Sequence, residues 1–310
     1  MRRSGMFALA LFAQLGCSHS EPFPPGNFAT DQPFIQGPPA RLTAQTGDDD
    51  DLRLTPDGSF VYVVNHQCMA FLLPHQARDS RWICPPRFQF VTDGYGLPVL
   101  SQSRRLAFVL TRQFENAGYP FYKALLVAPF SDIRDTTEVI PIPFRSVVDD
   151  LFHLSVRRAA WLRSDTLAIL TDGLVYLTDP ADTTRPRPFV RLALSGVSSM
   201  ESSRDGASLY FKLAGDSRIQ ALKMEGRTLS TVFDFGADSV GLFTIGQEHL
   251  AAATAGELTR IHLGTGSSTR FATYGLEIRD LAMTADGSDI VVSAVDIAGN
   301  GTSDLYRLSQ

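Results

Sequence analysis

Acidic side chains offer the first candidate chemistry in this sequence. Four consecutive aspartates occupy positions 48–51, and further carboxylates follow at intervals along the chain. Oxygen ligands that converge from several segments can bind calcium. The alternative is a solvated charge run, because unpaired carboxylates repel one another and stay in water. The candidate residues for a central channel or a metal site are Asp50, Asp51, Asp149, Asp150 and Asp280, with Glu201 as a sixth member of the set.

A second oxygen-rich segment is "DIAGNGTSD", which contains Asp296, Asn300 and Asp304. It lacks the alternating spacing of an EF-hand loop, and a hairpin turn explains the same residues. The sequence has no Gly-x-Ser-x-Gly elbow and no pair of histidines at the spacing of a zinc-binding helix. It therefore predicts no catalytic residue and no cofactor, with bound calcium as the alternative.

The first 17 residues are typical of an export signal. A positive "MRR" precedes an apolar stretch that is too short to span a bilayer. Gly16 and Cys17 then resemble the lipobox of bacterial lipoproteins, although Gln14 stands where that family usually has leucine. This resemblance implies lipidation of Cys17, and Ser18 after it implies release to the outer membrane on the periplasmic side. Ordinary secretory cleavage, which would give a soluble periplasmic protein, is the alternative.

Two further cysteines, Cys68 and Cys84, remain in a chain that we expect to be exported. Disulfides persist outside the cytoplasm. The segments "CMAFLL" and "RWIC" can pair antiparallel around a loop, which would place the two cysteines opposite each other. We therefore expect a disulfide between them, and two free buried thiols are the alternative.

The organisation after the signal has two parts. Residues 18–40 contain six prolines and show no periodicity, as expected for a tether, and residues 41–310 are the candidate folded domain. With 44% apolar and 20% charged residues, the chain is able to bury a large core. A formal charge of −5 without clustered basic residues argues against nucleic acid as a partner.

Six units with the same order of short strands fill the candidate domain. In each unit a polar turn precedes a strongly apolar strand. Asp57-Gly58, Asp205-Gly206 and Asp286-Gly287 supply the positive φ that a tight hairpin favours. The apolar strands expected after the turns are "SFVYVV", "RLAFVL", "TLAILT", "SLYFKL", "HLAAAT" and "DIVVSA". Turn spacings of about 40 to 60 residues predict an all-β fold with six four-stranded antiparallel blades, a six-bladed β-propeller.

The expected blades cover approximately residues 51–90, 91–148, 149–194, 195–236, 237–275 and 276–310. The last unit ends after its third strand, and an open blade would leave unpaired backbone groups. The segment "ARLTAQ" at 40–45 is compatible with a strand and has no other assignment. We expect residues 41–46 to complete the last blade by pairing with "DLYRLS"; a three-stranded last blade is the alternative.

The motifs "LTPDGSFVYVV" and "MTADGSDIVVSA" resemble the repeat of TolB-like propellers, which are WD-repeat-like folds. "VDIAGNGTSDLYRL" is similar to the hairpin that follows in that family. The resemblance is strong in units one, four and six, whereas "SQSRR" and "TIGQEH" replace the turn in units two and five. It implies a fold rather than an activity.

Exposed aromatic residues could anchor a protein partner. Such residues occur in a long insertion of the second unit, where they could instead cap the edge of their own blade. They are Phe114, Tyr119, Phe121 and Tyr122. We expect a non-catalytic binding or scaffolding propeller of the bacterial cell envelope, with an envelope protein as partner. A lactonase-like or glycan-processing propeller enzyme with a metal in its channel is the alternative.

Overall fold

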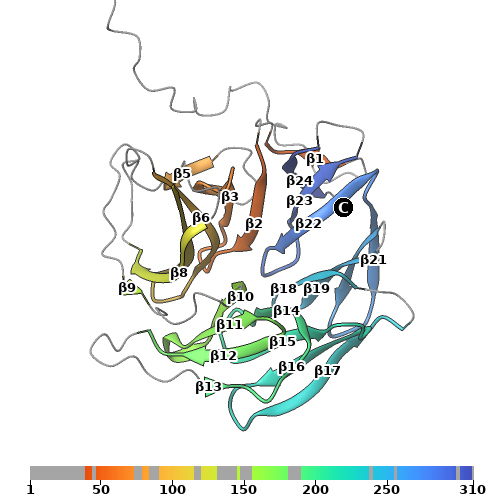
Figure 1. The fold of residues 1–310 in the computed structure, drawn as a ribbon. Helices are drawn as coiled ribbons and strands as arrows, with labels where there is room; N and C mark the ends of the chain where they lie inside the picture. The colour runs from red at the N-terminus through yellow and green to blue at the C-terminus, as the bar shows by residue number, and fades with distance from the viewer. Residues whose placement is uncertain are drawn as a thin grey trace, which may run out of the picture.

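The computed structural model describes residues 39–43, 47–72, 79–83, 91–114, 120–130, 145–146, 156–180, 190–236, 240–254, 257–297 and 301–308. These residues form six antiparallel sheets of four strands each, arranged in a ring (Figure 1). Their one helical element is a single 3-10 turn at Arg163–Asp165. The predicted six-bladed all-β fold is confirmed. No helix in the described ranges is long and apolar enough to cross a membrane.

Five blades are built from four consecutive strands and the sixth takes its outer strand from the N-terminal segment; the first of the consecutive strands is innermost in each. The first blade contains β2 (Asp49–Leu54), β3 (Phe60–Val64), β4 (Cys68–Leu72) and β5 (Asp79–Ile83). The second contains β6 (Val91–Leu100), β7 (Arg105–Phe114), β8 (Pro120–Pro129) and β9 (Arg145–Ser146). The third contains β10 (Val156–Trp161), β11 (Leu167–Thr171), β12 (Leu174–Thr178) and β13 (Val190–Arg191).

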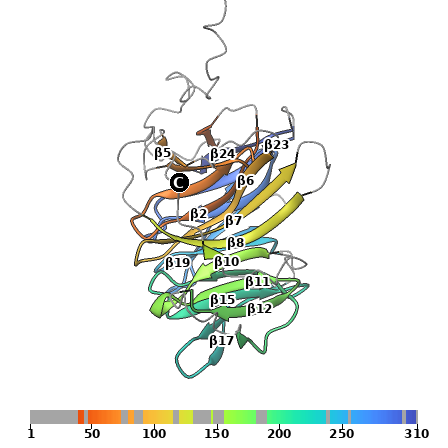
Figure 2. The same cartoon turned by 60° about the vertical axis from the view of Figure 1, so that its left-hand side comes forward.

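The remaining blades also have four strands each, and Figure 2 shows the ring from another side. The fourth contains β14 (Val197–Ser202), β15 (Ser208–Leu213), β16 (Arg218–Lys223) and β17 (Thr228–Asp234). The fifth contains β18 (Leu242–Ile245), β19 (His249–Thr254), β20 (Glu257–His262) and β21 (Ser268–Ala272). The sixth contains β22 (Leu276–Met283), β23 (Ile290–Asp296) and β24 (Ser303–Leu308), with β1 (Ala40–Arg41) as its outer strand.

The ring is closed by β1, which pairs antiparallel with β24. Arg41 lies opposite Tyr306, and the Leu42 amide donates to the carbonyl of Leu305 over 2.7 Å. Arg41 also forms an ion pair with the buried carboxylate of Asp304. The predicted closure by an N-terminal strand is therefore confirmed.

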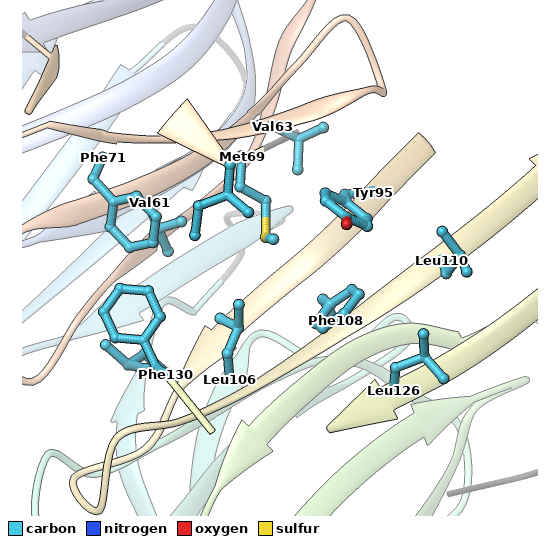
Figure 3. Packing of buried hydrophobic residues seen from close by; sticks show 12 residues of the cluster. Val61, Val63, Met69, Phe71, Tyr95, Leu106, Phe108, Leu110, Leu126 and Phe130 are labelled. Carbon is cyan, nitrogen blue, oxygen red and sulfur yellow. The ribbon is translucent and has the colours of Figure 1, made fainter. Parts of the chain in front are cut away.

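The core consists of apolar layers between adjacent blades. Successive side chains of a strand point to opposite faces, so each middle strand feeds two layers. Val61 and Val63 of β3 pack toward the second blade, as Figure 3 shows, whereas Phe60 and Tyr62 pack toward the sixth. The strongly apolar second strands of the repeat follow from this double burial.

The Asp-Gly turns have the conformation that their sequence predicts. In the first blade Gly58 has a φ of 89°, and its amide donates to the carbonyl of Thr55 over 3.0 Å. The Asp57 carboxylate accepts from the Ser59 amide at 3.1 Å. Where the second blade lacks the glycine, Arg104 takes a φ of 61° at the same point of the turn. The turn geometry is thus kept without its usual residue.

The insertion of the second blade extends a strand pair. β7 and β8 each run for 10 residues, and Gln113 lies opposite Pro120. Residues that the sequence placed in a long loop therefore belong in part to the β7–β8 ladder.

Candidate functional site

Four charged side chains from different blades meet at the channel. Arg53 lies on β2, Arg158 on β10, Glu201 on β14 and Asp280 on β22. Three of them directly follow a β-bulge, because pairing with the next strand shifts between Asp50 and Arg53, between Val156 and Arg158, and between Ile278 and Asp280. A bulge re-aims the side chain beside it. The repeated bulge therefore directs charged groups from separate blades toward the ring's centre.

Asp280 is the hub of this group. Its carboxylate accepts from Arg53 Nη1 at 2.5 Å and from Arg158 Nη2 at 3.1 Å, and its own strand adds the Leu281 amide at 3.0 Å. Burial alone would raise the pKa of Asp280, but Arg158 and Arg53 hold it below its usual value. Asp280 is therefore a buried carboxylate whose ionised form is favoured by two arginines.

Glu201 has a different environment. Its Oε1 accepts from Thr244 Oγ1 over 3.2 Å. Burial raises the pKa of Glu201 to about 7, because the loss of hydration outweighs the attraction of Arg53 and Arg158. The carboxyl group can therefore take up or release a proton near neutral pH.

Three of the four charged residues border a cavity of about 100 Å³ at the end of the channel where the inner strands turn into the second strands. Arg53, Arg158 and Glu201 supply its inner charges, and Trp161 and Met200 are among its apolar lining residues.

Arg204 lies at the rim of the cavity. It donates to the Pro56 carbonyl at 3.4 Å, and its own carbonyl accepts from Gln102 Nε2 at 2.6 Å. These bonds connect the first, second and fourth blades across the rim.

A second polar group lies at the opposite end of β2. The His66 Nε2 atom is 4.0 Å from Asp48 Oδ2 and 3.8 Å from Asp50 Oδ2. Ser303 holds the other oxygens, because its amide donates to Asp48 Oδ1 at 2.9 Å and its hydroxyl to Asp50 Oδ1 at 2.8 Å. Among the described residues, Asp48, Asp50 and His66 offer the set of ligand atoms whose spacing suits a metal ion.

The predicted channel residues are distributed over both ends. Asp280 and Glu201 lie together with Arg53 and Arg158, whereas Asp50 belongs to the group with His66. Asp51 accepts from the Leu97 amide of β6 at 2.8 Å. Asp149 and Asp150 lie outside the described residues, so their place remains a prediction.

A channel metal fits poorly at Asp280, since it would have to displace two arginines from the carboxylate. Of the second predicted calcium segment, Asp304 is paired with Arg41, Asp296 ends β23, and Asn300 is outside the described ranges. Calcium binding stays untested in both places.

The other predicted sites are only partly described. Phe114 ends β7, while Phe121 and Tyr122 lie on β8; Tyr119 is outside the described residues. Met69 lies opposite Ile83, which is the register that pairing of Cys68 with Cys84 requires. Cys84 and Cys17 are outside the described ranges, so disulfide and lipid both remain predictions.

The sequence reasoning missed Arg53 and Arg158. Each is one of many scattered arginines, and nothing in its local pattern distinguishes it. The available signal was the position of each residue in the innermost strand of its repeat, three or fewer residues before that strand's end.

The chain was compared with family models, curated proteins and solved structures, and only the solved structures gave matches. No family model and no curated protein matches the chain. Among solved structures, the β-propeller domain of Cps50 (Swd1) from Myceliophteria thermophila matches with a TM-score of 0.53 and 13% identity, over 87% of this chain and 99% of that one. A luciferin-regenerating enzyme matches with a TM-score of 0.57 and 12% identity, over 88% of this chain and 95% of that one.

At such low identity these structures are similar in fold alone. Together with the six sheets and the closing strand, they define the class: this chain is a six-bladed β-propeller.

Proposed function

We propose that this chain is a non-catalytic binding or scaffolding propeller of the bacterial cell envelope, exported and anchored by a lipid on Cys17. The TolB-like character of its repeat belongs to the same proposal. The proposed partner is an envelope protein, and the proposed location is the outer membrane.

The observation that carries this proposal is where the tether would enter the domain. β1 begins at Ala40, directly after the proline-rich segment, and it lies at the outer edge of the sixth blade. A lipid anchor attached through this strand would hold the ring by its rim. Both loop faces would then stay open to partners, which suits a binding role.

The channel supports the same proposal. Its central carboxylate, Asp280, is paired with two arginines and is therefore not free to act as a base or a metal ligand.

The test uses the full chain with a C-terminal tag, expressed in a bacterium from its own signal. We expect the protein in the membrane fraction, incorporation of a labelled fatty acid, and co-purification of a distinct envelope protein. Cys17→Ser is the matched control and should move the chain to the soluble periplasm without unfolding it. A chain that stays in the cytoplasm would contradict export, and reproducible absence of a partner would favour a purely structural spacer.

A second candidate function is that of a propeller enzyme, lactonase-like or glycan-processing. The observation that favours it is Glu201, whose pKa of about 7 beside a cavity suits general acid–base chemistry. In that case Glu201→Gln should lower hydrolysis of a lactone or glycan by at least about 100-fold. An absence of hydrolysis across both substrate classes would remove this candidate.

A further inference from the structure

The cavity at the end of the channel is positively charged in a protein of negative net charge. Three guanidinium groups line it, from Arg53, Arg158 and Arg204, against the single carboxyl of Glu201. Asp280 compensates part of this charge through Arg53 and Arg158. Asp51 also acts on Arg53, but neither Asp280 nor Asp51 lines the cavity, so three cations face one anion among the lining side chains. The cavity therefore favours an anion.

Asp280 does not occupy all the N–H groups of Arg53 and Arg158. A guanidinium carries five N–H groups. Asp280 accepts from Nη1 of Arg53 and from Nη1 and Nη2 of Arg158, and the Leu52 carbonyl also accepts from Nη1 of Arg53. A planar oxyanion can accept from the remaining N–H groups, for which the guanidinium fork is well suited.

The size of the cavity limits the ligand. Cavities of roughly 150 Å³ hold benzene, and each water occupies about 30 Å³. A cavity of about 100 Å³ therefore encloses a group smaller than benzene. Apolar walls that include Trp161 and Met200 can accept a methyl or methylene group beside the charged end.

We propose that this cavity binds a small free carboxylate of about four heavy atoms, for which acetate is the simplest probe, between Arg53, Arg158 and the carboxyl of Glu201. The proposal rests on the proposed binding function and names the ligand class of the channel.

Binding should be linked to a proton on Glu201. Its neighbours are Arg53 of β2, Arg158 of β10, Thr244 of β18 and Asp280 of β22. An ionised Glu201 would repel the bound carboxylate, whereas the protonated group would donate a hydrogen bond to it. Because the pKa of Glu201 is about 7, acetate should bind about tenfold more weakly at pH 8 than at pH 6.

Calorimetric titration of the full chain in detergent tests this, with sodium acetate as the probe and chloride balancing the ionic strength. A ligand of this size should bind with a dissociation constant between tens of micromolar and several millimolar. Glu201→Gln should bind acetate at pH 8 about as tightly as the unchanged protein does at pH 6. Arg204→Gln, at the exposed rim, should weaken binding a few-fold.

Arg279→Gln is the matched control, because Arg279 is an exposed arginine on β22 that pairs with Glu277. It should leave acetate binding unchanged. Absence of saturable heat at millimolar acetate and pH 6 would overturn the proposal. The proposal would also be overturned if acetate binding by Glu201→Gln depended on pH in the same way as acetate binding by the unchanged protein. Either result would leave co-purification of an envelope partner unaffected, so failure here is distinguishable from failure of the proposed function.

Discussion

The two ends of β2 differ in charge and in how that charge is held. Near its C-terminal end, Arg53 joins Arg158 and Asp280 in a buried network beside a cavity lined by arginines. At its start, Asp48 and Asp50 face the exposed His66. The first end is fixed by charges from several blades, while the second combines a loop of the first blade with Ser303 of the sixth.

This contrast shows what the inner strands of the ring can do. A buried charge needs partners from neighbouring blades, and a ring supplies them from several sides. An exposed group at a loop face has water as its alternative partner. We therefore expect substitutions at the two ends to differ most in their effect on stability.

The largest expected effect is at Asp280. Asp280→Ala would leave two arginines without their carboxylate, which should lower the free energy of unfolding by about 3–5 kcal/mol. Glu277→Ala, on the same strand but at an exposed ion pair with Arg279, is the control and should cost less than about 1 kcal/mol. Denaturant unfolding measures both. Equal losses of unfolding free energy in the two variants would contradict the contrast between the buried network and the exposed pair.

The next effect concerns pH at the cavity end. The pKa of Glu201 is raised to about 7 in the folded protein, so the native state holds a proton that the unfolded chain releases near pH 4.5. Stability from this group is present at low pH and is lost as pH rises through 7. Glu201→Gln cannot ionise, and it should gain about 3 kcal/mol relative to the unchanged protein between pH 4.5 and pH 8. Urea unfolding in buffers without carboxylates measures this, and a pH-independent difference would contradict it.

The next effect concerns the predicted disulfide near the start of β2, where Cys68 begins β4 directly after the turn that contains His66. Cys84→Ser should lower the free energy of unfolding by about 3 kcal/mol under oxidising conditions. Added reductant should destabilise the unchanged protein equally and leave the variant unaffected. Mass spectrometry of unreduced peptides should show Cys68 joined to Cys84; two free thiols there would refute the pairing.

The smallest expected effect is that of calcium. A binding propeller without a resident metal should melt at the same temperature, within about 1 °C, with calcium and with chelator. A rise of several degrees would contradict this and favour the metal alternative. Asp50→Asn would then show whether the acidic end of β2 is responsible, with Asp296→Asn as the control at the other predicted segment.

The fold could be predicted from the sequence because its signals are local. Asp-Gly turns fix where hairpins reverse, and doubly buried strands such as Ser208–Leu213 show as apolar runs at a regular interval. The missing fourth strand of the last unit revealed the closure, since only an N-terminal segment was left to fill it.

The candidate site was harder to predict from the sequence than the fold, for a physical reason. Asp280 was named because it lies in the innermost strand of its repeat. Its partners, Arg53 and Arg158, come from the first and third blades, and bulges rather than strand alternation direct them inward. Sequence periodicity cannot show a bulge, so the expected cluster of carboxylates became a mixed cluster of arginines and carboxylates.

The central claim is that this ring acts as a binding module through its loop faces. Its most direct test is photo-crosslinking of the intact chain in its native membrane, with the crosslinker placed at Tyr274 or Gln102 on the loop faces and at Leu229 on the outer strand β17 as the control. We predict a distinct envelope-protein adduct from at least one loop-face position and none from Leu229. Adducts from neither face, in a chain that is folded and membrane-bound, would contradict the claim.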